Sequence, residues 1–251
     1  GAGYRFSIIK LDRLKASTNG NLTILDMGLS GMNFAGFRAG AQWQPVPEFQ
    51  LGVTYRHKTE TVIEADSSTL LTSKVGKTTM DVVLPSKLGV GARYDVGPLG
   101  LAVDFEWGFN SQNDSTSIKG EGKDGKAGQE LPLPYKWADA MTVRVGNEYR
   151  FLDNYRLRAG YIFDDKTSNE KYPTAFGTPP APTHTMTAGL GYKSTNWEAN
   201  LAYAYRFGSV SVAAPTDDPT ATNNPECPAC SYAGDYEIKL HGVYVDFSWY
   251  F

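Results

Sequence analysis

The sequence predicts an all-β protein, an antiparallel transmembrane β-barrel of about ten strands that forms one domain over residues 1–251. Three observations carry this prediction. Hydrophobic residues alternate with polar ones along segments of about 10 to 12 residues, the length that a tilted strand needs to cross a bilayer. The connections alternate between short and long, and the last segment ends in aromatic residues, as expected for an outer-membrane barrel.

The two-residue period is clearest in residues 197–207, which read WEANLAYAYRF. Bulky apolar residues occupy every second position, and glutamate, asparagine, alanine and arginine stand between them. The pattern recurs in residues 99–109, 141–151 and 155–163, where charged residues fill alternate positions. Each segment therefore predicts a strand with one apolar face and one charged face.

A soluble β-sandwich would show the same alternation, so the period alone does not separate the two architectures. Strands of globular proteins, however, average about 5 to 6 residues, and these segments are about twice as long. Tyrosine and tryptophan also gather near the strand ends, as in the aromatic girdles of membrane barrels. Length and aromatic placement together favour the barrel.

Taken in order, the predicted strands are residues 2–11, 22–43, 48–63, 76–94, 99–110, 137–151, 155–165, 183–192, 197–208 and 236–251. Tight turns are predicted at 44–47, 95–98, 152–154 and 193–196, and longer polar loops at 12–20, 64–75, 111–136, 166–182 and 209–235. Short turns on one side and long loops on the other are typical of bacterial outer-membrane barrels, with the long loops outside the cell. This orientation predicts a periplasmic C-terminus.

The final strand alternates up to three aromatic residues at every second position, Phe247, Trp249 and Phe251. This pattern resembles the C-terminal strand by which outer-membrane barrels are recognised by the barrel assembly machinery. The alternative is that the last strand simply ends there.

Charge and hydropathy exclude other classes of protein. The formal net charge is −3, without the basic excess of a nucleic-acid-binding protein. No run approaches 18 consecutive apolar residues, which excludes a helical span, and residues 1–5 lack the features of a signal peptide.

Three stretches resemble the FadL/TodX family of outer-membrane transporters of long-chain fatty acids and hydrocarbons. They read PSKLGVGARYDVGPLGLAVDFEW (85–107), WADAMTVRVGNEYRFLDNYRLRAGYIFD (137–164) and HTMTAGLGYKSTNWEANLAYAYRF (184–207). The middle stretch is the most specific, with a tryptophan that opens a strand, a Gly-x-Glu-Tyr-Arg-Phe end, a short turn and a strand that contains Arg-Ala-Gly-Tyr. The resemblance covers most of residues 85–251 and is weaker before them.

The resemblance implies a fourteen-stranded barrel with an N-terminal hatch that moves hydrophobic small molecules inward without ATP. The hatch and the first strands have no counterpart here, so we expect this chain to be the C-terminal part of a longer protein; a complete ten-stranded barrel is the alternative. The implied surroundings are outer-membrane lipid and lipopolysaccharide, and no cofactor is implied. A general diffusion porin or a purely structural barrel is the competing function.

If the apolar face meets lipid, the charged face lines the lumen. Its candidate substrate-passage residues are Arg144, Glu148, Arg150, Arg156, Arg158, Glu198, Arg206 and Asp246. Because buried charges need partners, a structural ladder along the barrel wall is one interpretation. The other is that the arginines hold the carboxylate of a fatty acid, which a guanidinium can bind through two hydrogen bonds.

Ile238 and Leu240 share the parity of Asp246 and are therefore predicted to face the lumen as a patch for an acyl chain, unless a bulge at Gly242 shifts the phase. Cys227 and Cys230 form a Cys-Pro-Ala-Cys motif in a loop. We expect a local disulfide there, because the motif lies in no βαβ unit and two thiols alone make no zinc site.

Catalysis and metal binding find little support. The three histidines are His57, His184 and His241. A hydrolase would need one of them beside a serine or an acid, whereas Ser248 and Asp246 lie on the opposite face from His241 if the strand phase holds. We therefore expect neither an enzyme nor a metal protein.

Overall fold

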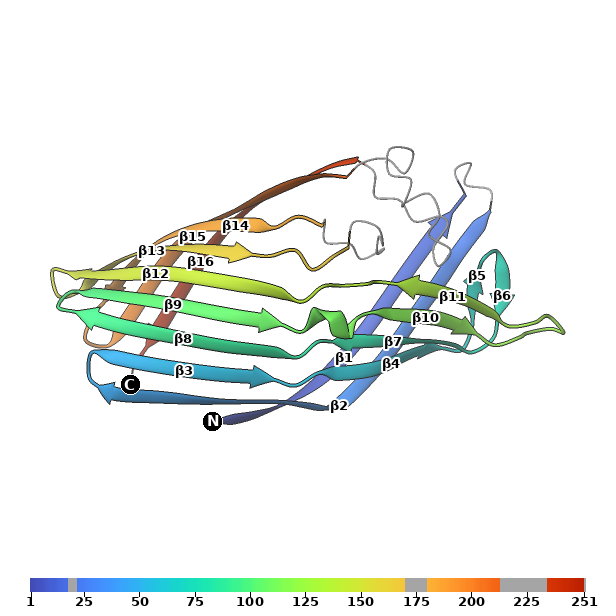
Figure 1. Cartoon of the computed structure of the whole chain (residues 1–251), viewed down its shortest axis with the longest axis horizontal. Coiled ribbons are helices and arrows are strands. Elements are labelled where there is room, and N and C mark those ends of the chain that lie inside the picture. Colours follow the sequence, from blue (N-terminus) through green and yellow to red (C-terminus); the bar gives the residue numbers. More distant parts are fainter. Residues whose placement is uncertain (18–21, 170–179, 213–233, 251) are drawn as a thin grey trace.

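The computed structural model describes residues 1–17, 22–169, 180–212 and 234–250. Its strands form one antiparallel sheet in the order β11-β10-β7-β4-β2-β3-β8-β9-β12-β13-β14-β15-β16, with β1 paired to β2 and the β5–β6 hairpin attached to β2. In Figure 1 the sheet is a long curved wall, and β15 and β16 pass behind β12 and β13. Within the described residues β1 and β16 do not pair, so the wall is an open barrel.

Ten strands form the continuous part of the wall, and some of them continue beyond it. They are β1 (Ala2–Ala16), β2 (Thr23–Val46), β3 (Phe49–Arg56), β8 (Lys87–Val96), β9 (Leu99–Gly108), β12 (Ala140–Phe151), β13 (Tyr155–Asp164), β14 (Thr183–Lys193), β15 (Trp197–Val212) and β16 (Gly234–Trp249). The remaining strands are β4 (Thr59–Ala65), β5 (Ser68–Leu70), β6 (Ser73–Val75), β7 (Thr78–Leu84), β10 (Ser115–Gly120) and β11 (Gln129–Pro134), with a 3-10 turn, η1 (Asn110–Gln112).

The all-β antiparallel class is confirmed, but the predicted strand count was wrong. The sheet has 16 strands. Residues 48–63 form two strands, β3 and β4, and residues 76–94 form β7 and β8. The predicted loops 64–75 and 111–136 contain the hairpins β5–β6 and β10–β11, which lie at the end of the wall away from the tight turns that join β8 to β9 and β12 to β13 (Figure 1).

The strand breaks have a common physical cause at Pro85 and Ser86. Pro85 has no N–H to donate to a ladder, so β7 ends just before it. The Ser86 hydroxyl accepts a hydrogen bond from the Lys58 N–H at 3.1 Å, and the Ser86 N–H donates to Gln112 Oε1 at 2.9 Å. Serine and glutamine side chains thus replace ladder bonds where three neighbouring strands are interrupted.

Tight turns fix the register at the other end. β12 and β13 pair without a shift from Thr142 opposite Asp164 to Phe151 opposite Tyr155. The turn between them places Leu152 and Asp153 at φ 48° and 53°, a left-handed conformation that tightens the connection. Because residues that lie directly opposite share a face, this register carries the alternation of β12 onto β13.

The two faces of the wall differ sharply in chemistry. On one face large apolar side chains are exposed, including Leu201 at 53% and Val245 at 78%. On the other face charged side chains pair with one another across strands. None of the helices in the described ranges combines the length and the apolar character that a bilayer crossing requires.

The buried core lies at the loop end of the sheet. Eight buried side chains form what we call the loop-end apolar cluster: Leu25, Met27, Leu29, Ile63, Leu70, Val75, Met80 and Ile118. Ile9 and Leu11 of β1 and Leu131 and Leu133 of β11 pack against it. The hairpins β5–β6 and β10–β11 therefore add strands that bury an apolar layer beyond the membrane-length part of the wall.

Candidate functional site

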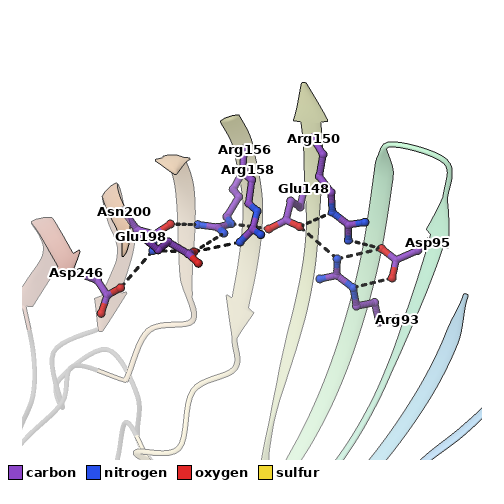
Figure 2. Close-up of polar contacts among 9 residues, drawn as sticks. All are labelled: Arg93, Asp95, Glu148, Arg150, Arg156, Arg158, Glu198, Asn200 and Asp246. Carbon is purple, nitrogen blue, oxygen red and sulfur yellow. Dashed lines mark hydrogen bonds and ion pairs between the residues drawn. The ribbon is translucent and has the colours of Figure 1, made fainter. Parts of the chain in front are cut away.

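A network of charged side chains crosses the charged face beside the tight turns (Figure 2). Its members are Arg93 and Asp95 on β8, Glu148 and Arg150 on β12, Arg156 and Arg158 on β13, Glu198 and Asn200 on β15, and Asp246 on β16. We call these nine residues the turn-end network. It contains four arginines and four carboxylates, so its formal charges cancel.

Glu148 is the centre of the network. Its Oε2 accepts a hydrogen bond from Arg158 Nε at 2.8 Å, and its Oε1 accepts from Arg150 Nε at 3.1 Å and Arg93 Nη2 at 3.4 Å. Asp95 holds the same two cations from the other side, with Oδ1 at 3.0 Å from Arg93 and 2.9 Å from Arg150. The Glu148 side chain is only 14% exposed, so these bonds replace most of its hydration.

The network continues across β13 to the last strand. Glu198 Oε1 lies 3.1 Å from Arg156 Nη1, and Asn200 accepts a hydrogen bond from Arg158 Nη1 at 2.7 Å. The Asn200 amide in turn donates to Asp246 Oδ1 at 3.2 Å. Side chains thus connect five strands across one face, as a brace of the barrel wall would.

Two other predicted lumen residues lie on the same face but apart from this network. Arg144 Nη2 lies 3.9 Å from Glu106 Oε1, which also accepts a hydrogen bond from Lys87. Arg206 Nη2 lies 3.4 Å from Asp164 Oδ2, and its Nε donates to Thr183. The sequence prediction thus placed these residues on one face, but they form separate groups there.

The last strand is paired along its whole length. β15 and β16 run without a register shift from Trp197 opposite Trp249 to Val212 opposite Gly234, so no bulge interrupts the ladder at Gly242. This register places Ile238 and Leu240 opposite Gly208 and Arg206, on the charged face. A role for both residues in substrate passage stays a prediction.

Several predicted residues lie elsewhere. Phe247 and Trp249 are exposed on the apolar face, with ring centroids 6.4 Å apart. Phe251, Cys227 and Cys230 lie outside the described residues. The assembly role of the terminal aromatic residues and the disulfide therefore stay predictions.

A second group of cations lies nearer the loop end. Arg38 stands opposite Arg56, and Arg56 stands opposite Lys87. Arg5 on β1 donates from Nη2 to Thr59 Oγ1 at 2.6 Å. We call Arg5, Arg38, Arg56 and Lys87 the loop-side cations.

The loop-side cations are less neutralised than the turn-end network. Lys87 shares Glu106 with Arg144, at 2.6 Å from Lys87 Nζ. Arg5, Arg38 and Arg56 make no ion pair with any residue that the structure describes, and the Nε atoms of Arg5 and Arg56 are buried without a hydrogen-bond partner there. This part of the face therefore carries positive charge that no described carboxylate neutralises.

These cations lie on the same face as the loop-end apolar cluster. On β1, Arg5 and the partly buried Ile9 share a face four positions apart, and on β4 the same spacing separates Thr59, which binds Arg5, from Ile63 in the cluster. Four strand residues span about 13 Å. The same face thus carries cations near Arg5 and Thr59 and apolar side chains near Ile9 and Ile63.

Between the loop-side cations and the turn-end network the charged face is hollowed. A hollow of about 620 Å³ is bordered by Gln42, Gln50, Gly52, Gly91, Asp104 and Arg144. Glycine at inward positions of β3 and β8 leaves this space because it carries no side chain. The described residues contain no group of three or more histidine, cysteine or carboxylate side chains suited to a metal ion.

The apolar cluster and Arg5 were not foreseen from the sequence. Leu25, Met27 and Leu29 have odd numbers, whereas the inward Arg38 on the same strand has an even one. The change follows a register shift between β1 and β2 at Arg5 and Ser7, where the alternation slips by one position. The sequence of β2, a strand of 24 residues, does not reveal where its alternation changes parity.

Residues 13–251 match the model of a family described as "Outer membrane protein transport protein (OMPP1/FadL/TodX)". No curated protein matches the chain.

Solved structures share the fold at low identity. A FadL homologue of Pseudomonas aeruginosa aligns with a TM-score of 0.65 and 16% identity, over 98% of this chain and 60% of its own. The toluene transporters TbuX of Ralstonia pickettii and TodX of Pseudomonas putida align with TM-scores of 0.59 and 0.58, each at 17% identity. The TbuX and TodX alignments cover 90% and 89% of this chain, respectively, and 50% of each transporter. The chain therefore spans about half to three fifths of the length of these three structures.

Proposed function

Because this chain belongs to the outer membrane protein transport protein (OMPP1/FadL/TodX) family, we propose that it forms part of the wall of a channel for passive movement of hydrophobic molecules. The passage needs no bound cofactor and no chemical step, since a concentration gradient supplies the driving force. The chain lies among outer-membrane lipid and lipopolysaccharide, with its long loops outside the cell and its C-terminus in the periplasm. Assembly machinery recognises it through Phe247, Trp249 and Phe251.

The observation that carries the proposal is that the loop-side cations and the loop-end apolar cluster lie on one face, with Arg5 on β1 and Thr59 on β4 each about 13 Å along the strand from apolar side chains of that face. An amphipathic molecule with a carboxylate and a long apolar chain presents the two complementary chemistries in the same order. A guanidinium binds a carboxylate through charge-assisted hydrogen bonds, and the apolar chain gains by leaving water. The guanidinium charges of Arg5 and Arg56 have no carboxylate partner among the residues that the structure describes.

The turn-end network supports a different role. Its charges cancel, and Glu148 alone holds three arginines. A substrate carboxylate would have to displace Glu148 or Asp95 from these arginines, which costs ionic hydrogen bonds already present. We therefore assign the turn-end network to bracing of the wall, and carboxylate binding to the loop-side cations.

The test is uptake by the full chain in the membrane, normalised to folded protein. Labelled long-chain fatty acid, toluene and a small sugar are compared in wild type, Arg5→Gln and Arg56→Gln. We expect both variants to take up fatty acid more slowly and toluene at the wild-type rate. Lys119→Gln is the matched control, because this exposed cation follows Ile118 on β10 and therefore points to the face opposite the cluster; it should leave all rates unchanged.

Three other results would contradict the proposal. Sugar flux as large as that of the hydrophobic compounds would show a general diffusion porin. No transport of any compound by folded protein would show a structural barrel. Turnover of an ester or peptide by purified protein would show an enzyme.

A further inference from the structure

The apolar face carries two histidines that each bond a tyrosine hydroxyl in the same way. Tyr161 Oη lies 2.6 Å from His184 Nδ1, and Tyr203 Oη lies 2.6 Å from His241 Nδ1. His184 is opposite Phe163 and Phe207, and His241 is opposite Tyr205. Tyr161 lies two positions nearer the tight turns than Phe163, which stands opposite His184. Tyr203 is placed in the same way relative to Tyr205, which stands opposite His241.

These histidines stand at one edge of the apolar band. Along β15 the outward residues from Trp197 to Phe207 are separated by ten positions. Ten residues rise about 34 Å along a strand, which is about 26 Å across a bilayer for a tilt of about 40°. That height matches the apolar band of an outer-membrane barrel, so Phe207 and the neighbouring His184 lie at the boundary between the acyl chains and the head groups.

The tyrosines determine which ring nitrogen carries the proton. A phenol hydroxyl among apolar side chains needs an acceptor, and within the described residues neither Tyr161 nor Tyr203 has any other hydrogen-bond partner. Each hydroxyl therefore donates to Nδ1 of its histidine. A neutral imidazole that accepts at Nδ1 carries its proton on Nε2, and the structure provides no partner for either Nε2 among these residues.

Lys239 completes the group. It lies opposite Phe207, which in turn lies opposite His184, so the three side chains form a row on the outward face. Lys239 is also two positions from His241 on the same strand and the same face. Its ammonium bonds Glu237 in this structure but has three donors, and its side chain is 55% exposed.

We propose that His184, His241 and Lys239 bind a phosphate group of membrane lipid at the loop-side edge of the apolar band. His184 on β14, and His241 and Lys239 on β16, place two N–H donors and one cation on the outward face at the depth of the head groups, on either side of β15. Phosphate oxygens are strong acceptors that suit this set, and neighbouring rings of Phe207 and Tyr205 pack against the histidines at 5.5 and 4.8 Å. The proposal does not rest on transport, because it concerns the outward face alone.

The first experiment measures the contact directly. The full chain, labelled with ¹⁵N at histidine, is placed in phosphatidylglycerol bilayers, and dephasing of each Nε2 signal by lipid ³¹P is recorded by solid-state NMR. Single His→Phe variants assign the three signals. We expect dephasing at His184 and His241, and its absence at both residues would overturn the proposal.

The tyrosine pairs provide an internal test. Tyr161→Phe removes the donor that holds the proton on Nε2 of His184, so dephasing should weaken at His184 and persist at His241. Tyr203→Phe should do the reverse. If each variant left its own histidine unchanged, the tyrosine would not orient the donor and that step of the inference would be wrong.

The second experiment measures preference. Native mass spectrometry of the full chain in equimolar phosphatidylglycerol and galactolipid should show the phosphate lipid retained preferentially by wild type. Lys239→Gln combined with His184→Phe and His241→Phe should abolish that preference, whereas Lys10→Gln, an exposed cation on β1, should keep it. Equal retention of the two lipids by wild type would overturn the proposal.

Discussion

Glu148 on β12 lies directly opposite Arg158 on β13, and a 2.8 Å hydrogen bond joins its Oε2 to Arg158 Nε. The relationship follows from the tight turn at 152–154, which makes the strands neighbours and sets Phe151 opposite Tyr155. Three pairs beyond Phe151 and Tyr155, the register brings Glu148 opposite Arg158. The local turn thus determines which charges meet on the lumen side of the wall.

Replacing Glu148 by glutamine should destabilise the protein by about 1 to 3 kcal/mol. The amide keeps the size of the side chain but leaves Arg93, Arg150 and Arg158 with less negative charge around them. Urea folding titrations in lipid vesicles give the difference. Glu237→Gln is the control, since its pair with Lys239 is exposed and should be worth less than about 1 kcal/mol. Equal effects of the two substitutions would contradict a bracing role.

Much of the wall could be predicted from the sequence, because each regular strand has one apolar face and one charged face. The alternation of residue types along the strand shows both faces. The run 141–151 shows its period openly, and its register with the next strand follows from a turn of three residues. The breaks at Pro85 and beside Lys58 could not be predicted in the same way. They depend on Ser86 and Gln112, which are distant in sequence and meet only in the folded sheet.

The residues of the site also differ in how far the sequence predicts their positions. The turn-end network lies on regular strands beside tight turns, so parity alone places Glu148, Arg156 and Glu198 on one face. Arg5 lies beside the register shift between β1 and β2, and the alternation of β2 changes parity across that shift. Long-range pairing across the shift brings Arg5 to Thr59, which no local pattern reveals.

The apolar face should not tolerate charge near its middle. Leu201→Arg and Val145→Arg should each cost about 2 to 4 kcal/mol of folding free energy in a bilayer, because the guanidinium enters the acyl-chain region. The Leu201 and Val145 side chains are 53% and 45% exposed on the face that meets lipid. Ala202→Arg is the control on the charged face beside a hollow and should cost less. Wild-type stability of the first two variants would place the wrong face toward lipid.

The seam between β2 and β4 should be sensitive to a single methyl group. These strands share one ladder pair, Ser30 with Glu64, and approach closely at Gly31. A Cβ on Gly31 would meet the Val62 carbonyl and lie 3.0 Å from Ile63 Cα, which are backbone atoms that cannot turn aside. Gly31→Ala should therefore cost about 1 to 3 kcal/mol.

Gly52→Ala is the matched control for the seam. A Cβ there has no neighbour within 4 Å, so the substitution should be neutral or slightly stabilising. Both variants are compared by urea titration and by protease cleavage of the loop-end strands. If both behaved alike, the close approach at Gly31 would not limit the packing of the seam.

Tyr135, between β11 and β12 at the loop end, should make stability fall at alkaline pH. Burial raises the pKa of this phenol to about 12, and the charge of Arg13 only partly opposes the rise. The folded state therefore holds a proton that the unfolded chain loses near pH 10, so the contribution is intact below pH 10 and is lost as pH rises to about 12. Urea titrations at pH 9, 10 and 11 should show a steeper decline in wild type than in Tyr135→Phe. Parallel declines would contradict the burial of this hydroxyl.

The arginines of the turn-end network should affect anionic and neutral substrates alike. Arg156 pairs with Glu198 and Arg158 with Glu148, so Arg156→Gln and Arg158→Gln each remove one cation from a carboxylate and loosen the wall between β12 and β15. Looser walls change passage for every compound. We therefore expect uptake of fatty acid and of toluene, normalised to folded protein, to change by the same factor in both variants. A fall in fatty-acid uptake alone would show that these arginines bind the substrate carboxylate, and it would move that role from Arg5 and Arg56 to the turn end.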